Sequence, residues 1–293
     1  MTDIASQCGI PCLNLPHGLM MLGLPEFFTS LEGGCVGAIS SVHRDRLVSA
    51  GLHPRRVRVT GDPYLDPILD RIRLSSARSR AHSATAVRRR YSVPPESRFL
   101  LLLSGGMDMP SSGATLPMID WAHAAHAAGR LATMIERHPQ WRFVVKCHPR
   151  RDHPRLYERL NERLPRGRRL AMAHDTSLHD LVPAADAVVS FNISTSGVIE
   201  SSLWGTPVIF LDTSMMWFDH EQWATDSWPR VNSVDELEEA LEAMFSDAGR
   251  YEEYVNRTQD AVHRFFDGPP QPAVPRCLET IDQLVLSPAV TST

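Results

Sequence analysis

The chain has 293 residues, of which 43% are hydrophobic, 22% charged and 7% aromatic. This is the composition of an ordinary globular protein, and it excludes a disordered, collagen-like or disulfide-scaffold protein. The net charge of −4 gives no electrostatic basis for binding nucleic acid. The longest uninterrupted apolar run, Phe99–Leu103, is too short to span a bilayer. Five scattered cysteines without a CxxC pair, and no leader pattern at the start of the sequence, predict a cytoplasmic protein with reduced thiols.

Short apolar runs alternate with helical patterns along most of the sequence. The predicted strands, in chain order, are Ile10–Leu15, Cys35–Ile39, Val57–Thr60, Phe99–Leu103, Arg142–Cys147, Leu170–Ala173, Ala187–Ser190 and Pro207–Leu211. The predicted helices are Val42–Ala50, Met118–Arg137, Pro154–Arg163, Ser177–Pro183, Thr195–Trp204, Ser233–Phe245, Arg250–Phe266 and Arg276–Leu286. Strands that alternate with helices and are apolar on both faces predict parallel sheets between layers of helices. The predicted fold class is therefore α/β.

An arginine-rich stretch, residues 71–90, indicates a boundary between two lobes. It contains seven arginines and no acidic residue, and Pro94-Pro95 follows it before the next strand. We interpret it as a solvated helix between the lobes, the alternative being a surface for acidic polymer or lipid headgroups. The predicted divisions are 1–69 for the first lobe, 70–97 for the basic segment, 98–232 for the second lobe and 233–293 for C-terminal helices.

Three basic side chains gather where the predicted strand 142–147 ends: Lys146, His148 and Arg150. In open α/β sheets, ligands bind outside the carboxyl ends of the strands. Pro149 restricts the backbone of His148, and Lys146 is the only lysine among 30 basic residues. The group suits a phosphate or diphosphate; the alternative is a strand end with surface charges and a capping histidine.

A second polar group follows the predicted strand 187–190. The hydroxyl-rich turn Ser194-Thr195-Ser196 leads into a helix that carries Glu200. Hydroxyls and unpaired backbone N–H groups at a helix start can bind an anion, and a carboxylate further along can accept hydrogen bonds from a ribose. The alternative is an ordinary N-cap with a surface glutamate. The turn Ser104-Gly105-Gly106 would also let backbone approach a phosphate.

His17, followed by Gly18, comes after the first predicted strand. It is a candidate general base across a cleft, or alternatively a buried or capping histidine. The 13 histidines are spread singly, so we predict no metal site. Walker A, GxSxG and complete GxGxxG patterns are absent from the sequence.

These motifs, taken in order, resemble the GT-B superfamily. The resemblance rests on His17-Gly18, Thr60-Gly61-Asp62-Pro63, Lys146-x-His148-Pro149, Ser194-Thr195-Ser196-x-x-x-Glu200 and Gly205-x-Pro207, and covers roughly residues 8–212. Within the superfamily, the pattern is most similar to bacterial capsule and teichoic-acid transferases with cytidine-activated donors. These include CDP-glycerol glycerophosphotransferases, and sialic acid and Kdo transferases with "HP" and "S-S/T" motifs.

The resemblance implies two Rossmann-like lobes and a nucleotide bound mainly by the second. His148 and the turn 194–196 would hold the donor phosphate, while Lys146 and Arg150 would stabilise charge on the departing nucleotide. Glu200 would bind the ribose, and His17 would deprotonate the acceptor hydroxyl. The resemblance implies no metal and no cofactor beyond the nucleotide-activated substrate. The acceptor would be a polysaccharide or a lipid-linked molecule.

The "HG" motif stands within twenty residues of Met1, whereas in the family it follows several strands of the first lobe. We therefore expect residues 1–69 to be the remnant of a truncated acceptor-side lobe, and activity to require its completion. The primary hypothesis is a metal-independent glycosyl- or glycerophosphotransferase of cell-surface polysaccharide synthesis, cytoplasmic or peripheral at the inner membrane face. The alternatives are a non-hydrolysing UDP-sugar 2-epimerase, and a non-catalytic nucleotide-binding or scaffold module that contacts a partner chain.

Overall fold

The structure is a computed structural model that describes Cys8 and residues 10–15, 34–104, 121–147, 155–191, 196–211 and 228–286. The chain divides into two compact units. The first unit combines residues 1–74 with residues 262–293, and the second unit comprises residues 75–261. The C-terminal segment therefore belongs to the same unit as the N-terminal one.

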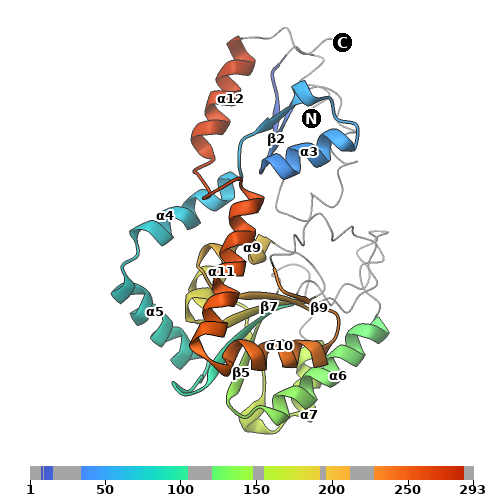
Figure 1. The fold of residues 1–293 in the computed structure, drawn as a ribbon, viewed down its shortest axis with the longest axis vertical. Helices are drawn as coiled ribbons and strands as arrows, with labels where there is room; N and C mark the ends of the chain where they lie inside the picture. The colour runs from blue at the N-terminus through green and yellow to red at the C-terminus, as the bar shows by residue number, and fades with distance from the viewer. Residues whose placement is uncertain are drawn as a thin grey trace. The chain divides into compact units, whose positions relative to one another are not determined.

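The first unit contains a three-stranded parallel sheet in the order β1-β2-β3. A small apolar cluster of Val36, Ala38, Leu47, Leu52 and Val57 forms its core. Figure 1 shows this sheet with its helices. Its elements are β1 (Leu13–Asn14), β2 (Cys35–Ala38), α3 (Ser41–Ser49), β3 (Val57–Val59), α4 (Asp66–Leu74) and α12 (Val274–Leu286).

The helix α12 is attached to the first unit by specific polar contacts. Both carboxylate oxygens of Asp66, the first residue of α4, accept backbone N–H groups, from Ala273 at 2.7 Å and Val274 at 2.8 Å. Gly61 has φ +83°, and a Cβ there would meet Ala273 and Arg276 at 2.9 and 2.4 Å. Close approach of α12 therefore requires glycine at position 61.

The second unit contains a six-stranded sheet in which every neighbouring pair is parallel. Its order is β6-β5-β4-β7-β8-β9. The strands are β4 (Arg98–Leu103), β5 (Trp141–Lys146), β6 (Ala171–Ala173), β7 (Ala187–Phe191), β8 (Val208–Leu211) and β9 (Arg230–Val231). The helices are α5 (Ala77–Arg90), α6 (Trp121–Arg137), α7 (Arg155–Arg163), α8 (Leu178–Leu181), α9 (Ser196–Leu203), α10 (Val234–Ser246) and α11 (Ala248–Phe265), the last of which continues into the first unit after Ala261.

Both faces of the six-stranded sheet are covered. On one face, side chains such as Leu100, Leu102 and Val145 pack with the apolar sides of α6, α7 and α10 in one core cluster. On the other face, Leu101 and Val144 are also fully buried. A central strand buried on both faces needs a continuous apolar run, which is the pattern that predicted β4.

All eight predicted strands are present, with ends that differ by at most a few residues; the first shortens to Leu13–Asn14. β9 was not predicted, because a two-residue strand leaves no periodic signal. The arginine-rich stretch forms two helices, α4 and α5, with Ser76 as the N-cap of α5. One of its arginines, Arg88, is not a solvated surface charge, because its partly buried guanidinium forms an ion pair with Asp186 at 2.6 Å.

Candidate functional site

The order of the six-stranded sheet creates a point at which the chain changes direction. From β4 the chain adds β5 and β6 on one side, and it then returns to add β7, β8 and β9 on the other. In open α/β sheets, ligands bind in the crevice outside the carboxyl ends of the strands at such a switch point. This rule points to the edge of the sheet at which β4 and β7 end.

The strand register brings the ends of four strands to the same edge. Leu103 of β4 lies opposite both Lys146 of β5 and Ser190 of β7, and Lys146 lies opposite Ala173 of β6. Ser104 follows directly after β4 and its backbone N–H donates to the carbonyl oxygen of Lys146 at 3.3 Å. Ser104 and Lys146 therefore share the carboxyl edge of the sheet.

Lys146 places its ammonium group at this edge. Its Nζ donates to the carbonyl oxygen of His174 at 3.1 Å and approaches that of Ala173 at 3.5 Å. Ala173 is the last residue of β6 and His174 follows it. The side chain of Lys146 therefore links the ends of the adjacent strands β5 and β6, and these two contacts orient its ammonium group. The sequence pattern did not indicate these two carbonyl partners.

Glu200 lies in α9, the helix that follows β7, and is only 3% exposed. Its Oε2 is 3.5 Å from Nε2 of His179 in α8, which the sequence analysis did not single out. A buried carboxylate is costly unless it is paired or hydrogen-bonded, and His179 is one such partner of Glu200. Glu200 is thus not the surface glutamate of the alternative interpretation.

Of the other predicted site residues, one lies within the described part of the chain. Ser196 is the first residue of α9. The remaining predicted site residues lie outside the described residues: His17, Gly105, Gly106, His148, Arg150, Ser194 and Thr195. Their roles stay predictions from the sequence.

No protein-family model matches the chain, and no curated protein matches it either. Among solved structures, UDP-GlcNAc 2-epimerase from Neisseria meningitidis, bound to UDP-GlcNAc, is similar with a TM-score of 0.64 and 14% identity, covering 96% of this chain and 72% of the epimerase. Anabaena HepE in complex with UDP-glucose is similar with a TM-score of 0.61 and 14% identity, covering 98% of this chain and 75% of HepE. The wall teichoic acid polymerase TagF gives a TM-score of 0.52 and 11% identity over 87% of this chain and 59% of its own.

The chain has a GT-B-like fold. Two parallel sheets with flanking helices confirm the predicted α/β class. At such low identities the likeness establishes the fold alone, and the cytidine branch remains a prediction. Among the described helices of this GT-B-like chain, none combines the length and the apolar character that crossing a bilayer requires.

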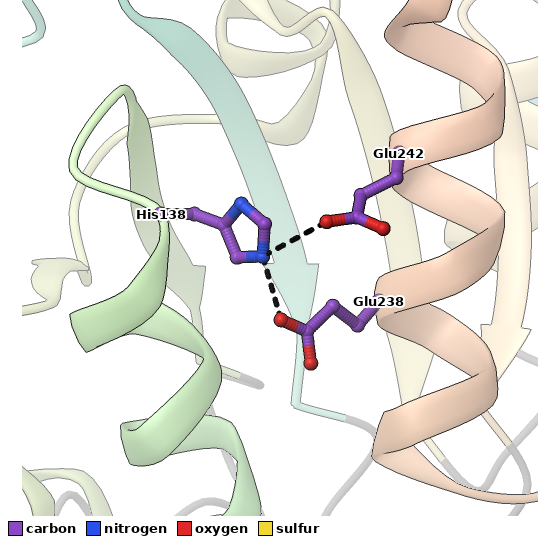
Figure 2. Close-up of side chains that lie close together, drawn as sticks. All are labelled: His138, Glu238 and Glu242. Atoms are coloured by element: carbon purple, nitrogen blue, oxygen red, sulfur yellow. Dashed lines mark hydrogen bonds and ion pairs between the residues drawn. The ribbon is translucent and has the colours of Figure 1, made fainter.

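One group of potential metal ligands occurs among the described residues, at the other end of β5 (Figure 2). His138 precedes β5, and its Nε2 lies 2.6 Å from Oε1 of Glu238 and 3.5 Å from Oε1 of Glu242, both in α10. The imidazole stacks on Trp141 with ring centroids 3.8 Å apart. Because His138 stands before β5 and Lys146 ends it, this group is not at the carboxyl edge of the sheet.

Arg137 explains this group without a metal ion. Its guanidinium pairs with both oxygens of Glu238, through Nε at 2.9 Å and through a second, shorter contact. Burial raises the pKa of Glu238, but the hydrogen bonds from Arg137 and His138 outweigh it and leave the pKa below its usual value. A guanidinium bound to the central carboxylate opposes a divalent cation, so we interpret the group as an ion-pair network that joins α6 and α10.

Proposed function

We propose that the chain binds a nucleotide-activated sugar or glycerol donor at the carboxyl edge of its six-stranded sheet. It would transfer the glycosyl or glycerophosphoryl group of this donor to a hydroxyl acceptor in the synthesis of a cell-surface polysaccharide. The observation that supports this most is the switch point between β4 and β7, with the only lysine of the chain fixed at that edge. The similar structures support the class of ligand, since the Neisseria meningitidis epimerase is bound to UDP-GlcNAc and Anabaena HepE is in complex with UDP-glucose.

The chemistry of Lys146 suits the phosphates of such a donor. An ammonium group has three N–H donors, and two of them are directed to the carbonyls that end and follow β6. The third can reach a ligand oxygen, and the positive charge would stabilise the diphosphate or monophosphate as it leaves. His148 and Arg150 follow on the same segment and would add to this charge.

The polar residues around α9 would hold the rest of the nucleotide. The turn Ser194-Thr195-Ser196 would bind a phosphate through hydroxyls and the first N–H groups of the helix. Glu200 would accept hydrogen bonds from the ribose, oriented by His179. The turn Ser104-Gly105-Gly106 would allow close backbone approach, and His17 would serve as the general base for the acceptor.

A second candidate function is a non-hydrolysing UDP-sugar 2-epimerase. The epimerase structure is similar to this chain with a TM-score of 0.64, against 0.52 for TagF, and over more of both chains. Both candidates would use the same nucleotide-binding edge. They differ in the nucleobase that is bound, cytosine or uracil, and in whether the donor group is transferred or the sugar is epimerised.

Calorimetric titration of the folded chain with CMP, CDP, UDP and ADP tests the nucleotide site. We expect micromolar binding of one pyrimidine nucleotide, weakened at least about tenfold in Lys146→Met, since a charge-assisted hydrogen bond is worth about 1.5–3 kcal/mol. The matched control is Arg142→Met, because Arg142 lies near the amino end of β5 and its guanidinium donates to Pro139. Arg142→Met should bind nucleotide unchanged.

The identity of the bound nucleotide decides between the two enzymes. Tighter CMP or CDP binding supports the transferase, and His148→Ala should then abolish binding or turnover. Tighter UDP binding, with inversion at C2 of UDP-GlcNAc seen by NMR, establishes the epimerase and overturns the transferase. A folded chain that binds none of the four nucleotides overturns both and leaves the non-catalytic scaffold.

A further inference from the structure

Exposed apolar side chains are concentrated in one part of the molecule. Nine large hydrophobic side chains are exposed among the described residues, and every one belongs to the first unit. Five of them lie on the single helix α12. The nine are Ile10, Leu15, Tyr64, Leu74, Val274, Leu278, Ile281, Val285 and Leu286. Single exposed hydrophobics are ordinary, but a continuous row of them on one helix marks an interaction surface.

The helix α12 has a buried row and an exposed apolar row about a quarter turn apart. The inner, buried row faces the rest of the first unit: Cys277 is 6% and Thr280 8% exposed, and Ala273, just before the helix, is 1% exposed. The outer row consists of Val274, Leu278, Ile281 and Val285, which are between 42% and 58% exposed. Both rows follow the spacing that places residues on one side of a helix. The inner row packs α12 against the rest of the first unit, whereas the side chains of the outer row remain exposed.

The spacing of the outer row reads the same in both directions. The steps from Val274 to Leu278, to Ile281 and to Val285 are four, three and four residues. This is the spacing of a two-helix coiled-coil seam. Because the row is symmetric on reversal, a second identical helix running antiparallel presents the same row at the same heights. The surface is therefore complementary to itself, as an interface around a two-fold axis must be.

We propose that the outer row of α12 is a homodimer interface, in which two copies of this chain pack their α12 helices antiparallel around a two-fold axis. The axis passes between Glu279 and Thr280, so that Val274 of one copy meets the partner's Val285. Leu278 likewise meets the partner's Ile281. The polar side of the helix, where Gln283 donates to Glu279 at 3.3 Å, faces away from this seam.

The size of the seam sets the strength of the dimer. Thirteen residues at 1.5 Å each give a helix about 20 Å long, so a seam of four side chains from each copy is small beside the about 1,600 Å² of a standard interface. We therefore expect a reversible dimer with a dissociation constant on the order of micromolar. This inference does not depend on the proposed function.

Sedimentation velocity of the full chain between about 1 and 200 μM tests the dimer across the expected dissociation constant. The double variant Leu278→Glu/Ile281→Glu should stay monomeric across this range. Its melting temperature should equal that of the parent chain when both are measured well below the dissociation constant, because both side chains are exposed in the monomer. The control is Leu286→Glu, which removes the most exposed apolar side chain of the helix, at 82%, from outside the outer row. This control should dimerise like the parent chain.

The direction of pairing has its own measurement. Spin labels at position 279, in a Cys8→Ser/Cys12→Ser background, should be nearly level along the helix axis of the dimer and give a shorter distance than labels at position 286. Along the helix axis the two copies of position 286 are about 20 Å apart in the antiparallel pair. Equal distances at the two positions would mean parallel pairing and overturn the antiparallel arrangement. A chain that is monomeric throughout, or a dimer that survives the double substitution, overturns the interface itself.

Discussion

The parallel sheets of the two units differ in how completely their strands are buried. In the second unit, β4 has a neighbouring strand on each side and apolar helices over its faces, so that residues 99–103 are all buried. In the described part of the first unit, only β2 has two neighbouring strands, and the apolar cluster is formed by five buried residues. All exposed large hydrophobics of the described chain belong to this smaller unit. Three short strands enclose little apolar volume, so the first unit depends on α12 and on what covers it.

The largest expected effect is the loss of a core side chain from the second unit. Leu101 is completely buried at the centre of β4, and Leu101→Ala should lower the free energy of unfolding by about 4 kcal/mol. The matched change in the first unit, Leu47→Ala in α3, removes an equally buried leucine and should cost about 3 kcal/mol, because the smaller cluster around it can collapse further into the space left. Denaturant unfolding of both variants measures the difference. Equal losses would contradict the contrast between the two cores.

Two ion pairs sharpen the same contrast at a smaller magnitude. Asp186 accepts hydrogen bonds from Arg88 and from the backbone N–H of Phe99, both at 2.6 Å, and thereby joins α5 to β4. Asp186→Ala leaves these partly buried donors without their acceptor and should cost about 3 kcal/mol.

The control is the ion pair of Asp70 and Arg73 on α4, in which both side chains are exposed. Asp70→Ala should change stability by no more than about 0.5 kcal/mol. Thermal or chemical unfolding of the two variants gives the comparison. A cost of similar size for both would show that the Asp186 contacts are as solvated as those on the surface of α4.

The sequence predicted the central strands β4 and β7 because each is a largely apolar run, and burial on both faces requires such runs. It did not predict the pairing of Arg88 with Asp186, since the two residues are 98 positions apart and meet only through the fold. The arginine-rich stretch was therefore interpreted as solvated throughout. Charge runs usually are, but one well-placed acidic partner is enough to fix one member of the run.

The candidate site shows the same limit. The basic group after β5 and the hydroxyl-rich turn before α9 are visible as local patterns. The strand order that brings β4, β5 and β7 side by side is not, because no pattern within a strand states which strand is its neighbour. The pairing of His179 with Glu200, from different helices, likewise exists only once the chain is folded.

The last of these effects concerns acid and the first unit alone. His43 in α3 is 1% exposed, and the backbone N–H of Ile39 donates to its Nδ1 at 3.1 Å, which requires the neutral ring. Burial, with a smaller contribution from Arg46, lowers the pKa of His43 from 6.5 to about 3.

In the unfolded chain His43 has its ordinary pKa, so between pH 6.5 and 3 the unfolded state binds a proton that the folded state does not. Stability contributed by the neutral His43 is therefore fully present above pH 6.5 and is lost as the pH falls, by about 2 kcal/mol at pH 5. Hydrogen exchange should show β2 amides losing protection between pH 7.5 and 5, after correction for the intrinsic exchange rate, while β4 amides keep theirs. His43→Asn retains an acceptor for Ile39 without a titrating ring and should remove the difference. If β2 remains as protected at pH 5 as at pH 7.5, the ring is protonated in the folded chain and the first unit is less tightly closed around α3 than its burial indicates.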